Sequence, residues 1–269
     1  MNKIFDSHSH YNDDAFRADY DNVLNLLKES GVGNVINVGY DIQSSQKALE
    51  QAKKEDFMYC AVGIHPENAE EILKPDSLEI LKNLAADPKV KAIGECGLDY
   101  HYEDAPEKDI QKQAFIRQID LANELDLPMI IHTRDAMADT IDILTAHPLK
   151  NGVIHCYSGS RESCKQLIKM GFYIGFTGVI TFKNARRAIE SMKVVPLDKL
   201  LIETDCPYMA PEPKRGKRCD SSLLHFTAQK MADELRFTKD EIIGITNQNA
   251  KKQKWLWLQC QNLNTAKTL

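Results

Sequence analysis

Residues 90–97 read VKAIGECG, a short apolar run that ends in a carboxylate, Glu95. Apolar residues at nearly every position are typical of a strand that is buried on both faces of a parallel sheet. Four further runs end on a histidine or an aspartate: residues 4–10, IFDSHSH; 127–135, LPMIIHTRD; 152–159, GVIHCYSG; and 200–207, LLIETDCP. In a closed parallel barrel, the C-terminal strand ends meet and build the active site. The repeated pattern therefore predicts a barrel with one functional site.

Strand-like and helix-like segments alternate along the chain, as in repeated βα units. Eight apolar runs are expected to be strands: residues 3–8, 34–39, 57–66, 90–97, 128–133, 152–157, 172–178 and 199–205. Segments with helical periodicity follow them: residues 20–30, 44–54, 66–86 with an interruption near Pro75, 107–125, 136–145, 162–170, 185–192, 222–235 and 239–258. We predict an α/β fold, a single-domain (β/α)8 barrel over residues 1–258, and a polar tail over residues 259–269. A doubly wound open sheet is the competing fold, but no GxGxxG turn follows the first strand.

The composition is that of an ordinary globular protein, with 43% hydrophobic and 27% charged residues. The formal net charge of −5 excludes attraction of nucleic acid through overall charge, so such binding needs a local basic patch. The 7 cysteines lack the spacing of a disulfide framework or a zinc knuckle. The first residues become polar too early for a secretory signal, and no apolar segment approaches the roughly 18 residues that span a bilayer. We expect a reduced, cytoplasmic monomer without membrane contact.

Six side chains at the expected strand ends are suitable metal ligands: His8, His10, Glu95, His132, His155 and Asp205. The first two are two residues apart in a strand, so both rings project to one face, with about 6.5–7 Å between their Cα atoms. Glu95 would be costly to bury without a cation beside it, and its two oxygens suit a bridge between two metal ions. We expect Gly94 and Gly97 to let an ion approach the backbone. We expect Asp6 on the opposite face, where it would orient a turn or a ligand.

Each of these residues has an ordinary structural interpretation when it is taken alone: an incidental HxH pair, a salt-bridged carboxylate, or a histidine satisfied in the core. Their joint occurrence at strand ends favours a metal site. We expect the HxH pair and Asp205 to hold one ion, His132 and His155 to hold a second, and Glu95 to bridge them. Imidazole and carboxylate together suit Zn²⁺, Mn²⁺, Co²⁺ or, less naturally, Mg²⁺. A water shared by two such ions would be the nucleophile, with Asp205 as general base.

These residues lie in motifs that resemble the TatD family of metal-dependent deoxyribonucleases, within the amidohydrolase superfamily. The motifs are D-x-H-x-H (residues 6–10), G-I-H-P (63–66), G-E-C-G-L-D-Y (94–100), H-T-R-D-A (132–136), H-C-Y-S-G (155–159), G-F-Y-I-G-F-T-G (171–178), E-T-D-C-P-Y (203–208) and R-G-K-R (215–218). The resemblance implies a TIM barrel, two metal ions on the six ligands, and nuclease activity, typically 3′→5′ on single strands. The chain departs from the family where Cys219, Asp220 and Ser221 replace N-E-P. We expect this segment to shape a pocket wall, so the departure would affect substrate preference.

Basic side chains cluster after the seventh and eighth expected strands, where this fold frequently binds phosphate. They are Lys183, Arg186, Arg187, Lys214, Arg215, Lys217 and Arg218. A solvated helix face explains the first three equally well, and an exposed loop explains the last four. We expect Arg215, Lys217 and Arg218 to bind nucleic acid. Arg134 would either bind phosphate or orient the loop of His132.

Other roles stay open on the sequence alone. His65 ends the third expected strand, and it would either contact substrate and pass a proton to the leaving oxygen or cap the next helix. The candidate catalytic residues are thus Asp205, Glu95 and His65. Tyr100, His101 and Tyr157 would either stack on bases or pack at the barrel rim.

The leading hypothesis is a two-metal 3′→5′ exodeoxyribonuclease that cleaves phosphodiester bonds of single-stranded DNA, or RNA, in DNA catabolism or repair. The alternative is a metal-dependent acyl hydrolase such as a D-aminoacyl-tRNA deacylase, because the same nucleophile can attack a carbonyl. A third hypothesis is a non-enzymatic metal-containing scaffold. Replacing Glu95 by Gln separates the scaffold from the enzymes, because a pure binding module would keep its affinity while catalysis would fall by orders of magnitude.

Overall fold

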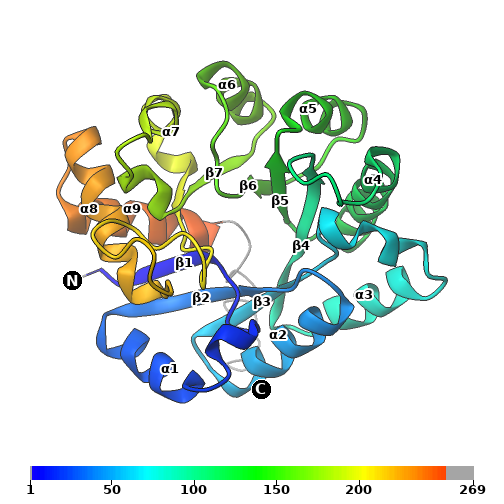
Figure 1. Ribbon diagram of the computed structural model, residues 1–269, viewed down its shortest axis with the longest axis horizontal. Helices are drawn as coiled ribbons and strands as arrows, with labels where there is room; N and C mark the ends of the chain where they lie inside the picture. Colours follow the sequence, from blue (N-terminus) through cyan, green and yellow to red (C-terminus); the bar gives the residue numbers. More distant parts are fainter. Residues whose placement is uncertain (1, 253–269) are drawn as a thin grey trace, which may run out of the picture.

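The computed structural model describes residues 2–252, and its strands form one eight-stranded parallel sheet in chain order. The strands are β1 (Ile4–Ser9), β2 (Val32–Val38), β3 (Met58–Val62), β4 (Val90–Asp99), β5 (Met129–Arg134), β6 (Gly152–Ile154), β7 (Tyr173–Phe176) and β8 (Leu200–Ile202). A parallel bridge between Ser9 and Cys206 joins the end of β1 to the chain just after β8. The sheet therefore closes into the predicted single-domain (β/α)8 barrel (Figure 1).

Helices follow the strands and surround the barrel (Figure 1). They are α1 (Tyr20–Glu29), α2 (Ile42–Lys54), α3 (Ser77–Ala85), α4 (Lys108–Leu125), α5 (Met137–Ala146), α6 (Arg161–Lys169), α7 (Arg186–Met192), α8 (Leu224–Leu235) and α9 (Lys239–Ala250). The helix expected over 66–86 is two elements, a 3-10 helix at Pro66–Leu73 and α3, separated around Pro75 as predicted. Residues 253–258 of the last expected helix, and the tail at 259–269, lie outside the described residues.

Apolar side chains fill the inside of the barrel. One buried cluster takes at least one residue from every strand: Phe5, Ile36, Val38, Tyr59, Ala61, Ala92, Ile130, Val153, Tyr173 and Leu201. Alternate strand residues face the helices, where they join a larger buried cluster that includes Ile4 and Val35. Full burial of one such side chain contributes about 1.5–3 kcal/mol. The interior is therefore packed, and the six candidate ligands lie near or just after the C-terminal ends of the strands. We call these strand ends, together with the loops that follow them, the barrel mouth.

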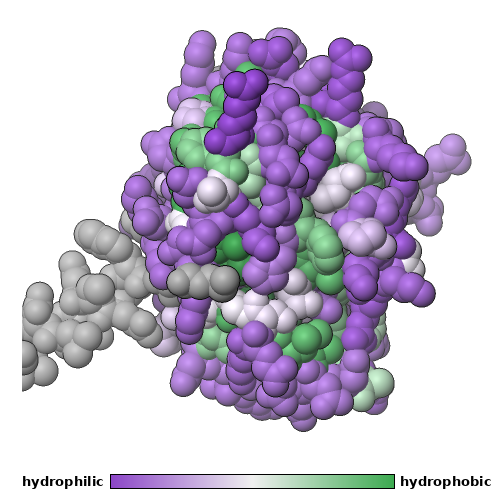
Figure 2. All heavy atoms as spheres, turned by 90° about the vertical axis from the view of Figure 1, so that its left-hand side faces the viewer, coloured by the Kyte–Doolittle hydropathy of each residue, from purple (hydrophilic) through white to green (hydrophobic). Residues whose placement is uncertain are grey.

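The outer surface is mostly hydrophilic on the side that carries α8. In Figure 2, charged and polar side chains cover this face, and only small apolar patches lie between them. Among residues 2–252, none of the helices has the length and apolar character that a membrane-spanning helix requires. The cysteines in this part of the chain are all free.

Candidate metal centre

An extra residue in β1 turns the two histidines of the HxH motif into the barrel mouth. Asp6 pairs with Val35 and Ser9 pairs with Asn37, so β1 advances by three residues where β2 advances by two. Because side chains alternate along a strand, such a bulge reverses the facing of every residue after it. Asp6 therefore faces the helices and His8 faces inward. The predicted opposite placement of Asp6 is correct, but it depends on a bulge that simple alternation does not predict.

A second bulge, in β4, places Glu95. Pairing with β5 advances from Ile93 to Cys96 on β4, against Met129 to Ile131 on β5. The glycines beside it have positive φ, 146° at Gly94 and 144° at Gly97, a conformation that residues with a Cβ rarely adopt. A Cβ at Gly94 would lie 2.6 Å from the carbonyl oxygen of Ile130. The structure gives these glycines a reason other than the expected one, because they make room for the backbone of β5.

The remaining three ligand candidates lie at or just after the ends of their strands. His132 is within β5, His155 directly follows β6, and Asp205 comes three residues after the end of β8. Asp205 has a φ of 60°, in the left-handed region that non-glycine residues enter uncommonly and aspartate more often than most. Its backbone N–H donates to the carbonyl oxygen of His8 at 3.0 Å. The polypeptide after β8 is thereby held against β1.

The six predicted ligand side chains meet at the barrel mouth. The Nε2 atoms of His8 and His10 lie 3.0 Å apart, and Oε2 of Glu95 lies 3.3 Å from the first and 3.6 Å from the second. Oδ1 of Asp205 lies 3.7 Å from Nε2 of His8 and 3.4 Å from Nε2 of His10. These four side chains form the first half of the predicted centre.

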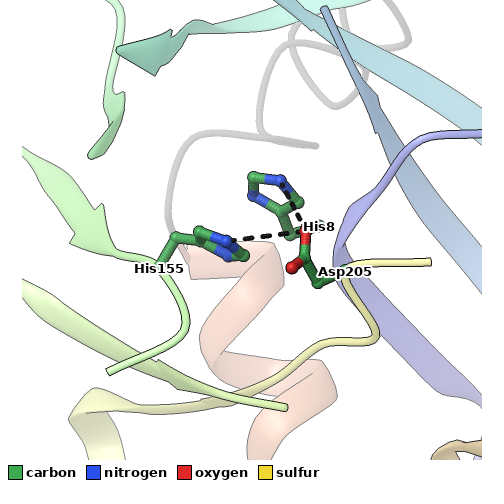
Figure 3. Close-up of side chains that lie close together, drawn as sticks. All are labelled: His8, His155 and Asp205. Atoms are coloured by element: carbon green, nitrogen blue, oxygen red, sulfur yellow. Dashed lines mark ion pairs between the residues drawn. The ribbon is translucent and has the colours of Figure 1, made fainter. Parts of the chain in front are cut away.

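The second half gathers on the other oxygen of Glu95. Oε1 lies 2.9 Å from Nδ1 of His132 and 3.6 Å from Nε2 of His155. His155 also belongs to the first half, because its Nε2 lies 3.7 Å from Oδ1 of Asp205 and its ring stacks on that of His8 at 3.6 Å. Figure 3 shows the carboxylate of Asp205 beside the two stacked rings, with an ion pair to each. The two halves are thus contiguous and share Glu95.

The hydrogen bonds around the histidines suit metal binding. Nδ1 of His10 faces the carbonyl oxygen of Val38 at 2.9 Å, and Nδ1 of His155 faces Oε1 of Glu203 at 2.9 Å. A carbonyl or carboxylate partner places the ring proton on Nδ1, so the Nε2 lone pair points toward the centre. Within residues 2–252, four overlapping trios of potential ligands have donor atoms within 4.8 Å of one another. The donor set therefore fits the divalent ions expected from the sequence.

Without a metal ion, the carboxylates attract protons to three of the histidines, His10, His132 and His155. Burial lowers the pKa of His155, but Glu203, Glu95 and Asp205 outweigh it and raise this pKa to about 10. Burial likewise opposes the effect of Asp99 and Glu95 on His132, whose pKa rises to about 9. Burial and the neighbouring His155 keep the pKa of His8 below its usual value. A divalent cation would replace the protons as the partner of the carboxylates.

Two carboxylates that orient the ligands were missed by the sequence reasoning. Oδ2 of Asp99 lies 3.0 Å from Nε2 of His132, and Glu203 holds His155. Carboxylates in this position fix the tautomer and orientation of metal-binding histidines. The carboxylate of Glu203 has room in the barrel because Gly175 has no side chain. A Cβ at Gly175 would lie 2.5 Å from Cδ of Glu203. Asp99 lies in the same motif as Glu95, and Glu203 lies in the same motif as Asp205. This shared motif was the signal in the sequence that could have indicated their role.

Asp6 connects β1 to the segment where the chain departs from its family pattern. It accepts hydrogen bonds from the backbone N–H of His8 and from Thr204, and Oδ2 also accepts from Oγ of Ser221 at 2.6 Å. Burial raises the pKa of Asp6 to about 7, although these hydrogen bonds oppose the shift. Cys219 and Ser221 are fully buried. Neither side chain therefore lines an open surface, whereas Asp220 between them is half-buried, and for Asp220 the pocket-wall role stays a prediction.

The structure shows the helix-capping arrangement of His65 and also directs its other ring nitrogen toward the centre. Nδ1 accepts the backbone N–H of Glu67 at 3.2 Å and so caps the 3-10 helix that follows β3. Nε2 lies 3.9 Å from Oε1 of Glu95, and the ring contacts that of His132 with centroids 4.5 Å apart. Because Nδ1 is an acceptor, a neutral ring carries its proton on Nε2, which is directed toward the centre.

The predicted basic residues differ in what they contact. Arg218 donates to both carboxylate oxygens of Asp19, at 2.8 and 2.6 Å, and to the carbonyl oxygen of Ala15. This bidentate pair uses the donors that a phosphate would need. Lys217 is exposed, and the exposed guanidinium of Arg215 lies over the ring of Phe182 at 4.3 Å.

Arg134 is half-buried at the end of β5. Its Nη1 donates to the hydroxyl of Tyr102 at 3.0 Å, and its guanidinium lies 5.0 Å from the centre of that ring. Arg134 also helps to lower the pKa of Asp99, against the effect of burial. Its positive charge is therefore close to the second half of the centre.

Comparison with known proteins agrees with this geometry. A family model described as TatD related DNase matches residues 5–253. An uncharacterized metal-dependent hydrolase, YabD of Bacillus subtilis, is 43% identical over 251 residues, which is 93% of this chain and 98% of the relative. The 3′-5′ ssDNA/RNA exonuclease TatD of Citrobacter rodentium is 31% identical over 256 residues, 93% of this chain and 97% of its own. The crystal structure of YJJV, a TatD homologue from Escherichia coli K12, has a TM-score of 0.86 at 29% identity, over 91% of this chain and 95% of its own.

The barrel, the convergent histidines and carboxylates, and these relatives define a metal-dependent hydrolase. More specifically, the chain belongs to the TatD related DNase family. The family resemblance stated from the motifs is thereby confirmed.

Proposed function

We propose that this protein is a two-metal 3′→5′ exonuclease that cleaves phosphodiester bonds of single-stranded DNA or RNA. The relative from Citrobacter rodentium that carries this activity in its name supports the substrate and the polarity. In this proposal, two ions of Zn²⁺, Mn²⁺, Co²⁺ or Mg²⁺ are held by the six predicted ligands: His8, His10, Glu95, His132, His155 and Asp205.

The observation that carries the proposal is the position of Glu95 between two sets of nitrogen donors. Its Oε2 faces the pair of histidines from β1 and its Oε1 faces His132 and His155. One buried carboxylate that addresses both sets suits a bridge between two cations, the arrangement found in nucleases and phosphatases. The chemistry that a pair of divalent ions supplies there is deprotonation of water near neutral pH and neutralisation of phosphate charge.

Asp205 is suited to accept the proton of the attacking water. Burial raises the pKa of its carboxyl group, but His155, His10 and His8 outweigh burial and hold the pKa below its usual range. The side chain is therefore ionised at neutral pH and available as a base. Its backbone hydrogen bond to His8 keeps the carboxylate at the centre of the ligand set.

His65 is suited to donate a hydrogen bond to a substrate oxygen. Burial lowers its pKa to about 3, so the ring is neutral at physiological pH, with the proton on Nε2. A neutral imidazole that gave up this proton entirely would become an imidazolate. We therefore favour a hydrogen bond to a phosphoryl or leaving oxygen over complete proton transfer.

Three basic residues remain candidates for phosphate contacts: Arg134, Arg215 and Lys217. The charge of Arg134 lies beside the second half of the metal centre, and the other two are exposed in the loop after β8. Arg218 is left out because Asp19 already occupies its donors. A local basic rim on a chain of net charge −5 would attract a nucleic acid end without attraction by the whole molecule.

The test uses protein stripped of metal and reloaded with each candidate ion. Single-stranded and double-stranded DNA and single-stranded RNA, labelled at the 5′ or the 3′ end, are incubated beside a D-aminoacyl-tRNA. We expect a ladder of 5′-labelled products that shortens from the 3′ end, and no products after chelation. The variant Glu95→Gln, with unchanged circular dichroism, is expected to lose activity by orders of magnitude.

Other outcomes point elsewhere. Release of the amino acid from intact tRNA, without cleavage of any strand, would replace this proposal with acyl hydrolysis. Nucleic acid binding that Glu95→Gln retains in full, without cleavage by the wild type, would favour a binding scaffold.

We also propose a cytoplasmic location, which the free cysteines of residues 2–252 support. The monomeric state stays a prediction.

A further inference from the structure

Two exposed tyrosines flank the metal centre, and neither was among the aromatic residues expected to stack on bases. Tyr208 is 57% exposed and Tyr102 is 45% exposed. By contrast, Tyr157 is buried, so of the two roles left open for it the structure shows packing. The hydroxyl of Tyr100 donates to Asp139 at 2.8 Å, and His101 pairs with Asp135 at 2.9 Å.

Tyr208 is anchored beside Asp205 while most of its side chain is open to solvent. Its backbone N–H donates to the carbonyl oxygen of Asp205 at 2.9 Å. Its hydroxyl donates to Oδ2 of Asp13 at 3.2 Å. Asp13 follows β1, and its own backbone N–H donates to the carbonyl oxygen of His10. The backbone of Tyr208 is therefore bonded to Asp205, its hydroxyl is bonded to the side chain of Asp13, and the ring remains exposed.

Tyr102 lies in the loop after β4, beside Arg134. The guanidinium lies 5.0 Å from the ring centre and donates to the tyrosine hydroxyl. Arg134 is two residues after His132 and its charge acts on Asp99, so this pair lies beside the second half of the centre. A tyrosine and a planar guanidinium together offer flat surfaces of the kind on which bases stack.

The two tyrosines stand on opposite sides of the barrel mouth. In the closed ring of strands, β8 and β1 lie opposite β4 and β5. Figure 1 shows the yellow segment after β8 on the left and β4 and β5 on the right. The loops that carry the two tyrosines therefore leave opposite sides of the ring, and we infer that each tyrosine contacts a different base.

We propose that Tyr208 and the Tyr102–Arg134 pair each hold one unpaired base, on the two sides of the phosphodiester bond that is cleaved. This inference rests on the proposed nuclease function and specifies its substrate. Stacking on an aromatic ring accepts any base, because every base has a π face. It also requires that the base is not enclosed in a duplex, so the mouth selects single strands and does not read sequence.

The experiment combines removal of a ring with removal of a base. The substrates are a single-stranded oligonucleotide of mixed sequence and two copies with one abasic nucleotide, on the 5′ or the 3′ side of the first bond cleaved. The enzymes are the metal-loaded wild type, Tyr208→Ala and Tyr102→Ala. Tyr208→Phe retains the ring, and Phe237→Ala removes an exposed aromatic residue that follows α8. Metal content and thermal unfolding are measured for every variant.

We expect each abasic substrate to lower kcat/KM of the wild type by roughly 5- to 100-fold. Tyr208→Ala is expected to cause a similar loss on the intact oligonucleotide and no additional loss for one of the two abasic positions. Tyr102→Ala is expected to behave in the same way for the other position. Phe237→Ala should resemble the wild type, Tyr208→Phe should keep the wild-type penalty for both abasic positions, and metal content should not change.

Two results would overturn the inference and can be told apart. If the wild type cleaves the oligonucleotides but both alanine variants retain the full penalty for each abasic position, the tyrosines do not hold bases and the nuclease function stands. If the wild type cleaves no nucleic acid in any metal-loaded form, the proposed function fails and this inference fails with it.

Discussion

Asp99 holds Nε2 of His132 at 3.0 Å, while Nδ1 of the same ring lies 2.9 Å from Oε1 of Glu95. The imidazole is thus fixed at both nitrogens, and the one that faces Glu95 is left to bind a metal. Asp99 is almost fully buried, so its hydrogen bond with His132 is shielded from solvent. The position of a ligand from β5 therefore depends on a residue near the end of β4.

We predict that Asp99→Leu weakens metal binding at the second half of the centre. Loss of such an orienting carboxylate typically lowers metal affinity about 10- to 100-fold. Asp99→Asn should retain most of the affinity, because its amide oxygen can still accept the Nε2 proton. Titration calorimetry with Zn²⁺ or Mn²⁺ measures both effects, and the exposed Asp135→Asn serves as the control. Equal affinity in Asp99→Leu and the wild type would contradict the assigned role.

Gly97→Ala is expected to destabilise the protein and displace Glu95. Gly97 has a φ of 144°, and an added Cβ would overlap the carbonyl oxygen of His132. Strain of this kind costs about 1–3 kcal/mol before the overlap is relieved. Gly171→Ala is the control, because Gly171 also has positive φ but nothing lies within 4 Å of an added Cβ. Denaturant unfolding should show a clearly larger loss for Gly97→Ala, and similar losses would refute the packing argument.

The metal-free protein is predicted to lose stability as the pH rises from 7 to 10. The surrounding carboxylates overcome burial and raise the pKa of His132 to about 9 and of His155 to about 10. Their protonated forms therefore favour the folded state. This contribution is complete below the unfolded pKa near 6.5 and disappears as the pH passes through the folded values.

Thermal unfolding of metal-free and metal-loaded protein across this pH range checks the prediction. The metal-loaded form should show a smaller decrease, because a cation replaces the protons. His155→Gln in the metal-free form should reduce the pH dependence. Parallel curves for the metal-free and metal-loaded proteins would be evidence against proton occupancy of these histidines.

The Arg218–Asp19 pair predicts that Arg218 makes no phosphate contact. In the Glu95→Gln background, which prevents cleavage, Arg218→Ala should leave the salt dependence of DNA binding unchanged. Lys217→Ala should reduce the slope of log affinity against log salt by about 1, as expected when one phosphate contact is lost. Fluorescence anisotropy at several salt concentrations measures both slopes. A reduced slope for Arg218→Ala would show that the arginine leaves Asp19 when nucleic acid binds.

Much of the barrel followed from local sequence patterns. The alternation of apolar runs with helical segments predicted the eight strands and most helix positions, because periodicity and turn residues act over a few residues. The break near Pro75 was also predictable, because proline interrupts a helix. The six candidate ligands were recognised from their common place at strand ends, and the structure brings all of them together.

By itself, the sequence determined the fold class and the chemical identity of the six candidate ligands, because strand formation and side-chain chemistry are local properties. Only the tertiary structure decided how those ligands face one another. The bulges in β1 and β4 depend on pairing with the next strand, and Glu203 reaches His155 across 48 residues of sequence. Arg218 meets Asp19 from 199 positions away. Such contacts arise when distant segments pack together, so no pattern within a single segment encodes them.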